Sequence, residues 1–130
     1  MIGAVADTSE WIEYLAMRPA PAFRQWLESG SVIVPPIVLA ELTSGARSHE
    51  EQFVIEDLLA DLQMHACSFH HCARAGELRR TLRAKGISVS TLDALVAQCA
   101  LDLDAPLLTR DAVFWKIAAH TKLRLASALP

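Results

Sequence analysis

The sequence predicts an α/β domain with a mostly parallel sheet. Short apolar runs alternate along the chain with longer amphipathic stretches, and no segment resembles a linker, a repeat or a low-complexity tract. Hydrophobic residues make up 52% of the 130 residues and charged residues 21%, so the chain can bury a core without a disulfide or a metal ion. We therefore expect one globular domain.

Each strand is expected at a short apolar run bounded by turn-forming residues. The expected strands are residues 2–6, 31–34, 62–67 and 106–109, with a fifth, edge strand at 123–125. The helices between them begin at cap-forming residues or prolines, and several end at glycines. The expected helices are residues 8–15, 21–29, 36–45, 49–60, 70–85, 90–103 and 111–119.

Charge and composition restrict the function classes. The formal net charge of -3 argues against a protein that coats nucleic acid through bulk positive charge. No apolar run approaches the roughly 18 residues of a membrane helix, and the first residues lack a secretory pattern. The three cysteines, Cys67, Cys72 and Cys99, have no framework spacing, which favours reduced thiols and a cytoplasmic location.

Two acidic residues follow predicted strands. Asp7 comes after the first strand and Asp111 after the fourth. Because ligands bind beyond the carboxyl ends of parallel strands, both are candidate site residues. Each also opens a predicted helix, so the alternative interpretation is an N-cap.

Two further acids lie in apolar helical segments. Glu41 has Ile37, Val38 and Leu42 as helical neighbours, where an unpaired carboxylate is costly. The alternative is a position at the rim of the packed face, with the carboxylate in water. Asp93 lies three residues after Ser90, so a capping box is its alternative role.

The four acids together favour a divalent cation. Crowded carboxylates raise one another's pKa values, and a cation removes the repulsion. Ligands that are all oxygen favour Mg²⁺ or Mn²⁺ over zinc, and such a site can hydrolyse phosphodiesters without a protein nucleophile. The hydroxyls of Thr8, Ser9 and Thr109 could hold a carboxylate or a phosphate; their alternative role is capping and turn formation.

A second candidate cluster contains Cys67, His70, His71 and Cys72. These residue types suggest zinc, but adjacent residues across a strand–helix junction do not suit a tetrahedral site. We favour core cysteines and surface histidines.

Basic residues group on one predicted helix, at Arg79, Arg80, Arg83 and Lys85. A solvated face is the simpler interpretation, and contact with RNA phosphates is the functional one. Arg110, beside Asp111, is the better single candidate for binding a phosphate or a partner's carboxylate.

Aromatic residues group on the first two helices, at Trp11, Tyr14, Phe23 and Trp26. Core packing is expected, although some could line a groove for a partner's helix.

These residues resemble a known family. Four segments carry the resemblance to PIN-domain ribonucleases, in particular VapC-type toxins of toxin–antitoxin pairs, and they span nearly the whole chain in the family's order. The segments are Val5-Ala6-Asp7-Thr8-Ser9, Leu39-Ala40-Glu41-Leu42, Ser90-Thr91-Leu92-Asp93-Ala94-Leu95-Val96-Ala97 and Leu107-Leu108-Thr109-Arg110-Asp111-Ala112-Val113-Phe114.

The resemblance implies a three-layer α/β/α sandwich with a central sheet of four or five strands, forming a single nuclease domain over residues 1–130. It implies that Asp7, Glu41, Asp93 and Asp111 are catalytic and coordinate Mg²⁺ or Mn²⁺. It also implies RNA as substrate, a cognate antitoxin as inhibitor, and a homodimer or a larger assembly with the antitoxin. One mild departure is Trp115, at a position that is commonly polar in the family.

Two other function classes fit the acidic end of the sheet. A non-catalytic module could use it to dock a basic partner. A phosphoryl-accepting domain shares the doubly wound sheet, but such domains place a lysine after a late strand, where this chain has Thr109, Arg110 and Asp111.

Overall fold

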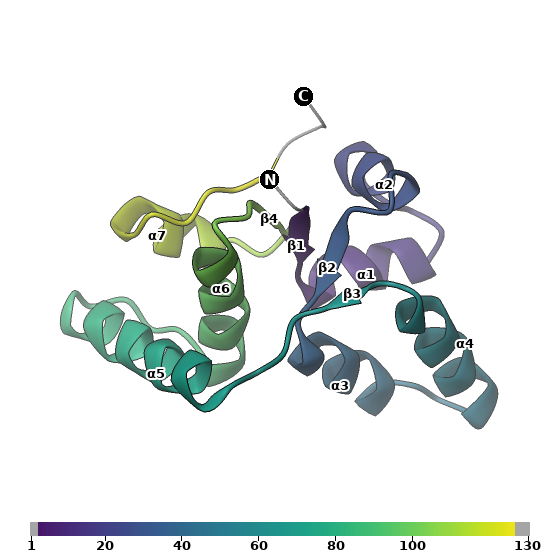
Figure 1. Cartoon of the computed structure of the whole chain (residues 1–130), viewed down its shortest axis with the longest axis horizontal. Helices are drawn as coiled ribbons and strands as arrows, with labels where there is room; N and C mark the ends of the chain where they lie inside the picture. The colour runs from purple at the N-terminus through teal and green to yellow at the C-terminus, as the bar shows by residue number, and fades with distance from the viewer. Residues whose placement is uncertain (1–2, 127–130) are drawn as a thin grey trace.

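The computed structural model describes residues 3–126, which form four strands and seven helices (Figure 1). In chain order these are β1 (Ala4–Ala6), α1 (Thr8–Leu15), α2 (Pro21–Glu28), β2 (Val32–Val34), α3 (Pro36–Ser44), α4 (His49–Ala60), β3 (Gln63–Met64), α5 (Phe69–Ala84), α6 (Thr91–Leu103), β4 (Leu107–Leu108) and α7 (Val113–His120). Ile2, expected in the first strand, lies outside the described residues.

The sheet is parallel, with the strand order β3-β2-β1-β4. β1 is interior: Val5 pairs with Ile33 on one side and with Leu107 on the other. Gly3 precedes it with a φ of 156°, and a Cβ there would overlap the Ser31 carbonyl oxygen, so glycine is required for this approach. The carboxyl ends of the four strands therefore lie along one edge.

Helices cover both faces of the sheet, which is the α/β/α arrangement that the resemblance implies. In Figure 1, α5, α6 and α7 lie on one side, and α1, α2 and α4 on the other. The strand side chains Val5, Ile33 and Leu107 are fully buried in the core between these layers. Burial on both faces explains why the strands are continuous apolar runs instead of alternating ones.

Two strand expectations are corrected. The third strand is β3, two residues long instead of the expected 62–67, because the chain leaves the exposed edge of the sheet after Met64. The expected edge strand at 123–125 is reduced to an isolated parallel bridge between Leu107 and Leu125. Both segments lie at an edge of the sheet, where the length of a strand depends on its single partner more than on its own residue types.

The helix starts agree with the capping chemistry of the sequence. Asp7, Ser48 and Ser90 are N-caps whose side chains accept hydrogen bonds from backbone N–H groups. Within residues 3–126 no helix combines the length and the apolar character needed to cross a bilayer.

Candidate active site

The site begins where β1 and β4 end side by side. Asp7 directly follows β1, and Thr109 to Asp111 follow β4, its parallel neighbour. The Asp7 N–H donates to the Leu108 carbonyl across this junction, at 3.0 Å. Two segments about a hundred residues apart in the chain therefore meet at the carboxyl edge of the sheet, as parallel pairing requires.

Asp7 is only 5% exposed, and its carboxylate has several donors. Oδ1 accepts from the Ser9 hydroxyl at 2.6 Å and from the Ser9 N–H at 3.1 Å, while Oδ2 accepts from the Thr109 hydroxyl at 2.7 Å. Burial raises the pKa of Asp7, although the hydrogen bonds from Ser9 and Thr109 oppose the shift. The carboxylate is thus fixed in position but remains costly to ionise.

The same hydroxyls fix the loop after β4. Ser9 Oγ accepts from the Arg110 N–H at 2.9 Å, and Thr109 Oγ1 accepts from the Asp111 N–H at 3.0 Å. Asp111 Oδ1 in turn accepts from the Val113 N–H at 3.1 Å, at the start of α7. Asp111 is exposed, and its other carboxylate oxygen accepts no hydrogen bond from within residues 3–126. The N-cap of α7 is Ala112, so the N-cap interpretation of Asp111 is wrong.

Glu41 reaches the site from α3. It is half-buried, and its Oε1 accepts from the Thr8 hydroxyl at 2.9 Å. Thr8 is the first residue of α1, directly after Asp7. The rim position considered for Glu41 is therefore correct, and a hydroxyl orients its carboxylate.

Asp93 lies in the first turn of α6. Its N–H donates to the Ser90 hydroxyl at 3.1 Å, so the capping interaction is present. The pKa of Asp93 is raised first by burial and then by the charges of Asp111 and Glu41, with the Ser90 hydrogen bond opposing. Asp93 is therefore close enough to Glu41 and Asp111 to feel their charges.

The four acids form a loose cluster. Within residues 3–126, no three of them bring ligand oxygens within 4.8 Å of one another. The charges of Asp111 and Glu41 nevertheless add to the effect of burial in raising the pKa of Asp93, and a cation would relieve that repulsion. Such spacing suits Mg²⁺, which keeps several waters and needs only one or two direct carboxylates.

Glu10 is a site neighbour that the sequence analysis missed. It is 3% exposed, and its Oε2 has no hydrogen-bond partner within residues 3–126. Its pKa is raised first by burial and then by Asp7, while the Arg110 guanidinium opposes the shift. Its position three residues after Asp7 on the same helix could have revealed it, because residues at i and i+3 share a face.

A groove leads away from the acids. A hollow of about 440 Å³ is lined by Thr8 and Glu41 together with Ile12 and Leu15 of α1. Leu15 also lines an adjoining hollow of about 730 Å³ between α1, α2 and α4, where Phe53 is 66% exposed. Apolar side chains exposed along such a groove are typical of a protein-binding surface.

The aromatic expectation is largely confirmed. Trp11, Phe23 and Trp26 are buried, and the rings of Trp11 and Phe23 pack edge to face at 5.0 Å. Only Tyr14 of this group is half-buried and lines the groove.

The basic residues divide into two kinds. Arg79 Nε donates to the Val89 carbonyl at 2.7 Å and so ties α5 to the loop before α6. Arg80, Arg83 and Lys85 are exposed, as is Arg110 at the rim of the site.

The expectation of core cysteines and surface histidines is wrong for Cys67, Cys72 and His71. Cys67 and Cys72 are exposed instead of forming part of the core, with their sulfurs 3.3 Å apart. His70 is exposed as expected, but His71 is buried and contacts Asp102. Residue type did not predict burial here, because α5 turns His71 toward α6 and leaves His70 and Cys72 on its exposed side.

The comparison with protein families shows to which family the chain belongs. The chain matches the PIN domain family over residues 4–120. This chain belongs to the PIN-domain family. The matched range contains Asp7, Glu41, Asp93 and Asp111, so all four acids lie within the PIN domain.

Solved structures resemble the PIN domain over nearly its whole length. VapBC2 from Rickettsia felis, bound to a promoter DNA fragment, has a chain that is 25% identical, with a TM-score of 0.78 and coverage of 95% of this chain and 96% of that one. DNA-bound VapBC from Salmonella typhimurium is 22% identical, with a TM-score of 0.82 and coverage of 97% and 98%. VapBC-5 from Mycobacterium tuberculosis is 20% identical, with a TM-score of 0.71 and coverage of 96% and 98%. No curated protein sequence matches the chain significantly.

Proposed function

We propose that this PIN domain is an endoribonuclease that depends on Mg²⁺ or Mn²⁺ and acts as the toxin of a toxin–antitoxin pair. The observation that carries the proposal is the gathering of acids from separate elements around the carboxyl ends of β1 and β4. They come from the β1–α1 junction, α3, α6 and the loop before α7: Asp7, Glu41, Asp93 and Asp111. Membership of the PIN-domain family supports the same activity.

Each residue has a distinct part in the proposal. Asp7, Glu41, Asp93 and Asp111 would hold the ion, some of them through water. When bound there, the ion supplies a nucleophilic water and stabilises negative charge on the phosphodiester. Ser9 and Thr109 hold the Asp7 carboxylate, and Thr8 holds that of Glu41. Arg110, exposed at the rim, is placed to bind a phosphate of the RNA.

The partner in the proposal is an antitoxin that occupies the groove beside Glu41. An apolar helix of the antitoxin would cover Leu15 and Phe53, and a basic side chain could then reach Glu41. The chains of similar fold were solved in VapBC complexes, which supports this choice of partner. The proposal extends to a single domain, a cytoplasmic location that suits three unpaired thiols, and a homodimer or a larger assembly with the antitoxin.

The decisive experiment is cleavage of RNA by the purified protein. We expect cleavage with MgCl₂ or MnCl₂ and none with EDTA. Asp7→Asn and Asp93→Asn keep the side-chain volume but remove a charge. Replacing a residue that only supports a metal ligand lowers activity by up to about 100-fold, so replacing a proposed ligand should lower the cleavage rate by at least about 100-fold. Asp104→Asn is the matched control, because Asp104 is 95% exposed at the far end of α6.

Normal cleavage by both the Asp7 and Asp93 variants would refute the site assignment. The acidic end could instead dock a basic partner without catalysis, as the sequence also allowed. That function predicts no cleavage in either metal, together with partner binding that is lost in Glu41→Gln.

A further inference from the structure

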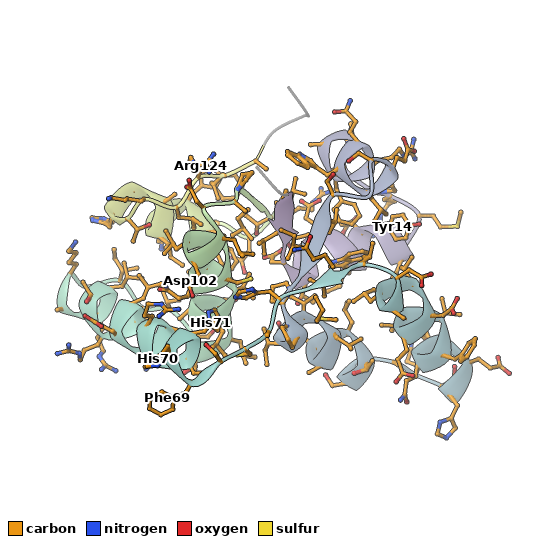
Figure 2. All side chains as sticks on the ribbon, viewed as in Figure 1. Tyr14, Phe69, His70, His71, Asp102 and Arg124 are labelled. Atoms are coloured by element: carbon orange, nitrogen blue, oxygen red, sulfur yellow. The ribbon has the colours of Figure 1, made fainter. Side chains whose placement is uncertain are left out.

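A second cluster of ligating side chains lies away from the four acids. His65 follows β3, His71 lies on α5 and Asp102 lies near the end of α6. One ligand atom from each lies within 4.8 Å of the other two, which no other trio of potential ligands within residues 3–126 achieves. Figure 2 shows His71 and Asp102 meeting between α5 and α6, while Phe69 points outward.

The pair of His71 and Asp102 already has nearly the spacing of two zinc ligands. His71 Nδ1 lies 3.0 Å from Asp102 Oδ2. A tetrahedral zinc ion with bonds of about 2.0–2.1 Å places adjacent ligand atoms about 3.3 Å apart. An ion could therefore replace the proton between these atoms with a movement of a few tenths of an ångström.

His65 supplies an independent observation that points to a ligand. Its Nε2 is buried and has no hydrogen-bond partner within residues 3–126. A buried polar atom without a partner destabilises the fold, and such atoms in native proteins have an explanation such as a bound ion or water. The His65 ring lies 5.3 Å from that of His71, nearly perpendicular to it. Burial, followed by the proximity of His71, lowers the pKa of His65, so the ring is neutral and able to bind a metal at pH 7.

Asp102 is held ionised and in a fixed orientation. Its side chain is 15% exposed. Oδ1 accepts from Arg74 Nε at 2.9 Å and from Gln98 at 2.8 Å, and Oδ2 accepts from Arg74 Nη2 at 2.7 Å. Burial opposes ionisation, but the hydrogen bonds from Arg74, Gln98 and His71 outweigh it and hold the pKa of Asp102 well below its usual range. Such supporting hydrogen bonds are typical of metal-binding carboxylates.

We propose that His65, His71 and Asp102 form a second metal site, for a divalent transition ion of the zinc class. Two imidazoles and one carboxylate suit Zn²⁺ far better than Mg²⁺, with water as the fourth ligand. The site is separate from the four acids, because Asp102 lies nine residues after Asp93 on α6, about 13 Å along the helix axis. The bound ion joins the end of the short edge strand β3 to α5 and α6, and its binding releases the His71 Nδ1 proton to solvent.

The test is a zinc titration of the untagged, metal-stripped protein. ZnCl₂ is added against a competing chromophoric chelator, with excess MgCl₂ present to fill the acidic site. We expect one tight equivalent of zinc in the wild type, and at least tenfold weaker binding in His65→Gln. His70→Gln is the matched control because His70 is an exposed neighbour outside the trio, and it should bind as the wild type does. Asp93→Asn should also leave zinc binding unchanged.

A second measurement keeps the test independent of mutant folding. In wild-type protein with labelled histidines, one equivalent of ZnCl₂ should shift the ring nitrogen signals of His65 and His71 but not those of His49, His70 and His120. Zinc bound equally well by His65→Gln would overturn the proposal, and so would zinc lost in Asp93→Asn. A thiolate-to-metal band with Co²⁺ that disappears in Cys67→Ser would also overturn it, since the exposed thiols would then be the ligands.

Discussion

The Thr109 hydroxyl links Asp7 to Asp111 in the candidate site, and removing it tests that geometry. It donates to Asp7 Oδ2 at 2.7 Å and accepts from the Asp111 N–H at 3.0 Å. Thr109→Val keeps the shape but leaves one oxygen of a buried carboxylate without its donor. Hydrogen bonds to charged groups contribute about 1.5–3 kcal/mol, so we expect the free energy of unfolding to fall by about 2 kcal/mol.

That change is measurable by thermal unfolding. At about 2.1 cal/mol/K per residue, a chain of 130 residues has an unfolding entropy of about 0.27 kcal/mol/K, so the melting temperature should fall by about 7 °C at pH 7. Thr109→Ser is the control: it keeps the hydroxyl and loses one methyl group, worth about 0.8 kcal/mol or about 3 °C.

The pH dependence adds a second criterion. The Thr109 hydrogen bond opposes the rise in the pKa of Asp7, so it favours the ionised carboxylate. The deficit of Thr109→Val should therefore be largest where Asp7 is ionised and should shrink as the pH falls and Asp7 is protonated. A valine variant that melts no lower than the serine variant at pH 7 would refute the reasoning.

Two further predictions concern Glu10 and the groove. The pKa of Glu10 is raised in the folded state, so its ionisation weakens the fold as the pH rises above 4.5. Glu10→Gln should therefore melt at a higher temperature than the wild type at pH 7, and at the same temperature below about pH 4. A variant that melts lower than the wild type at pH 7 would contradict this. Phe53→Ser should weaken antitoxin binding at least about tenfold by calorimetry, as expected for an aromatic anchor, without slowing RNA cleavage. The control is Trp115→Ser, at another exposed aromatic that lies outside the groove. Equal losses in the two variants would exclude the groove as the docking site.

The parts of the fold that the sequence predicts are those encoded locally. The helix starts at Asp7, Ser48 and Ser90 follow from side-chain capping, which depends on a few neighbouring residues. The strands at 62–67 and 123–125 failed because their lengths depend on which partner lies beside them, and apolar character does not report that.

The candidate site also has parts that the sequence predicts and parts that depend on tertiary packing. Asp7 and Asp111 could be placed together because parallel strands end at a common edge. The contact between His71 and Asp102 could not be predicted, because the two residues are thirty-one positions apart and meet only where α5 packs on α6. Glu10 was overlooked because a glutamate on a short helix is usually solvated, whereas here it is 3% exposed.

The capping roles of the acids are compatible with the metal-binding role that we propose for them. As the N-cap of α1, Asp7 is held beside backbone N–H donors and at the positive end of the helix dipole, both of which favour its ionised form. Asp93 lies in the first turn of α6, and Asp111 Oδ1 accepts a hydrogen bond from the Val113 N–H at the start of α7. Asp7 and Asp93 thus both lie at helix starts, where the helix dipoles offset part of the cost of ionising their carboxylates. Capping was the alternative to a functional role for these acids. In the structure it helps the fold to tolerate their negative charges.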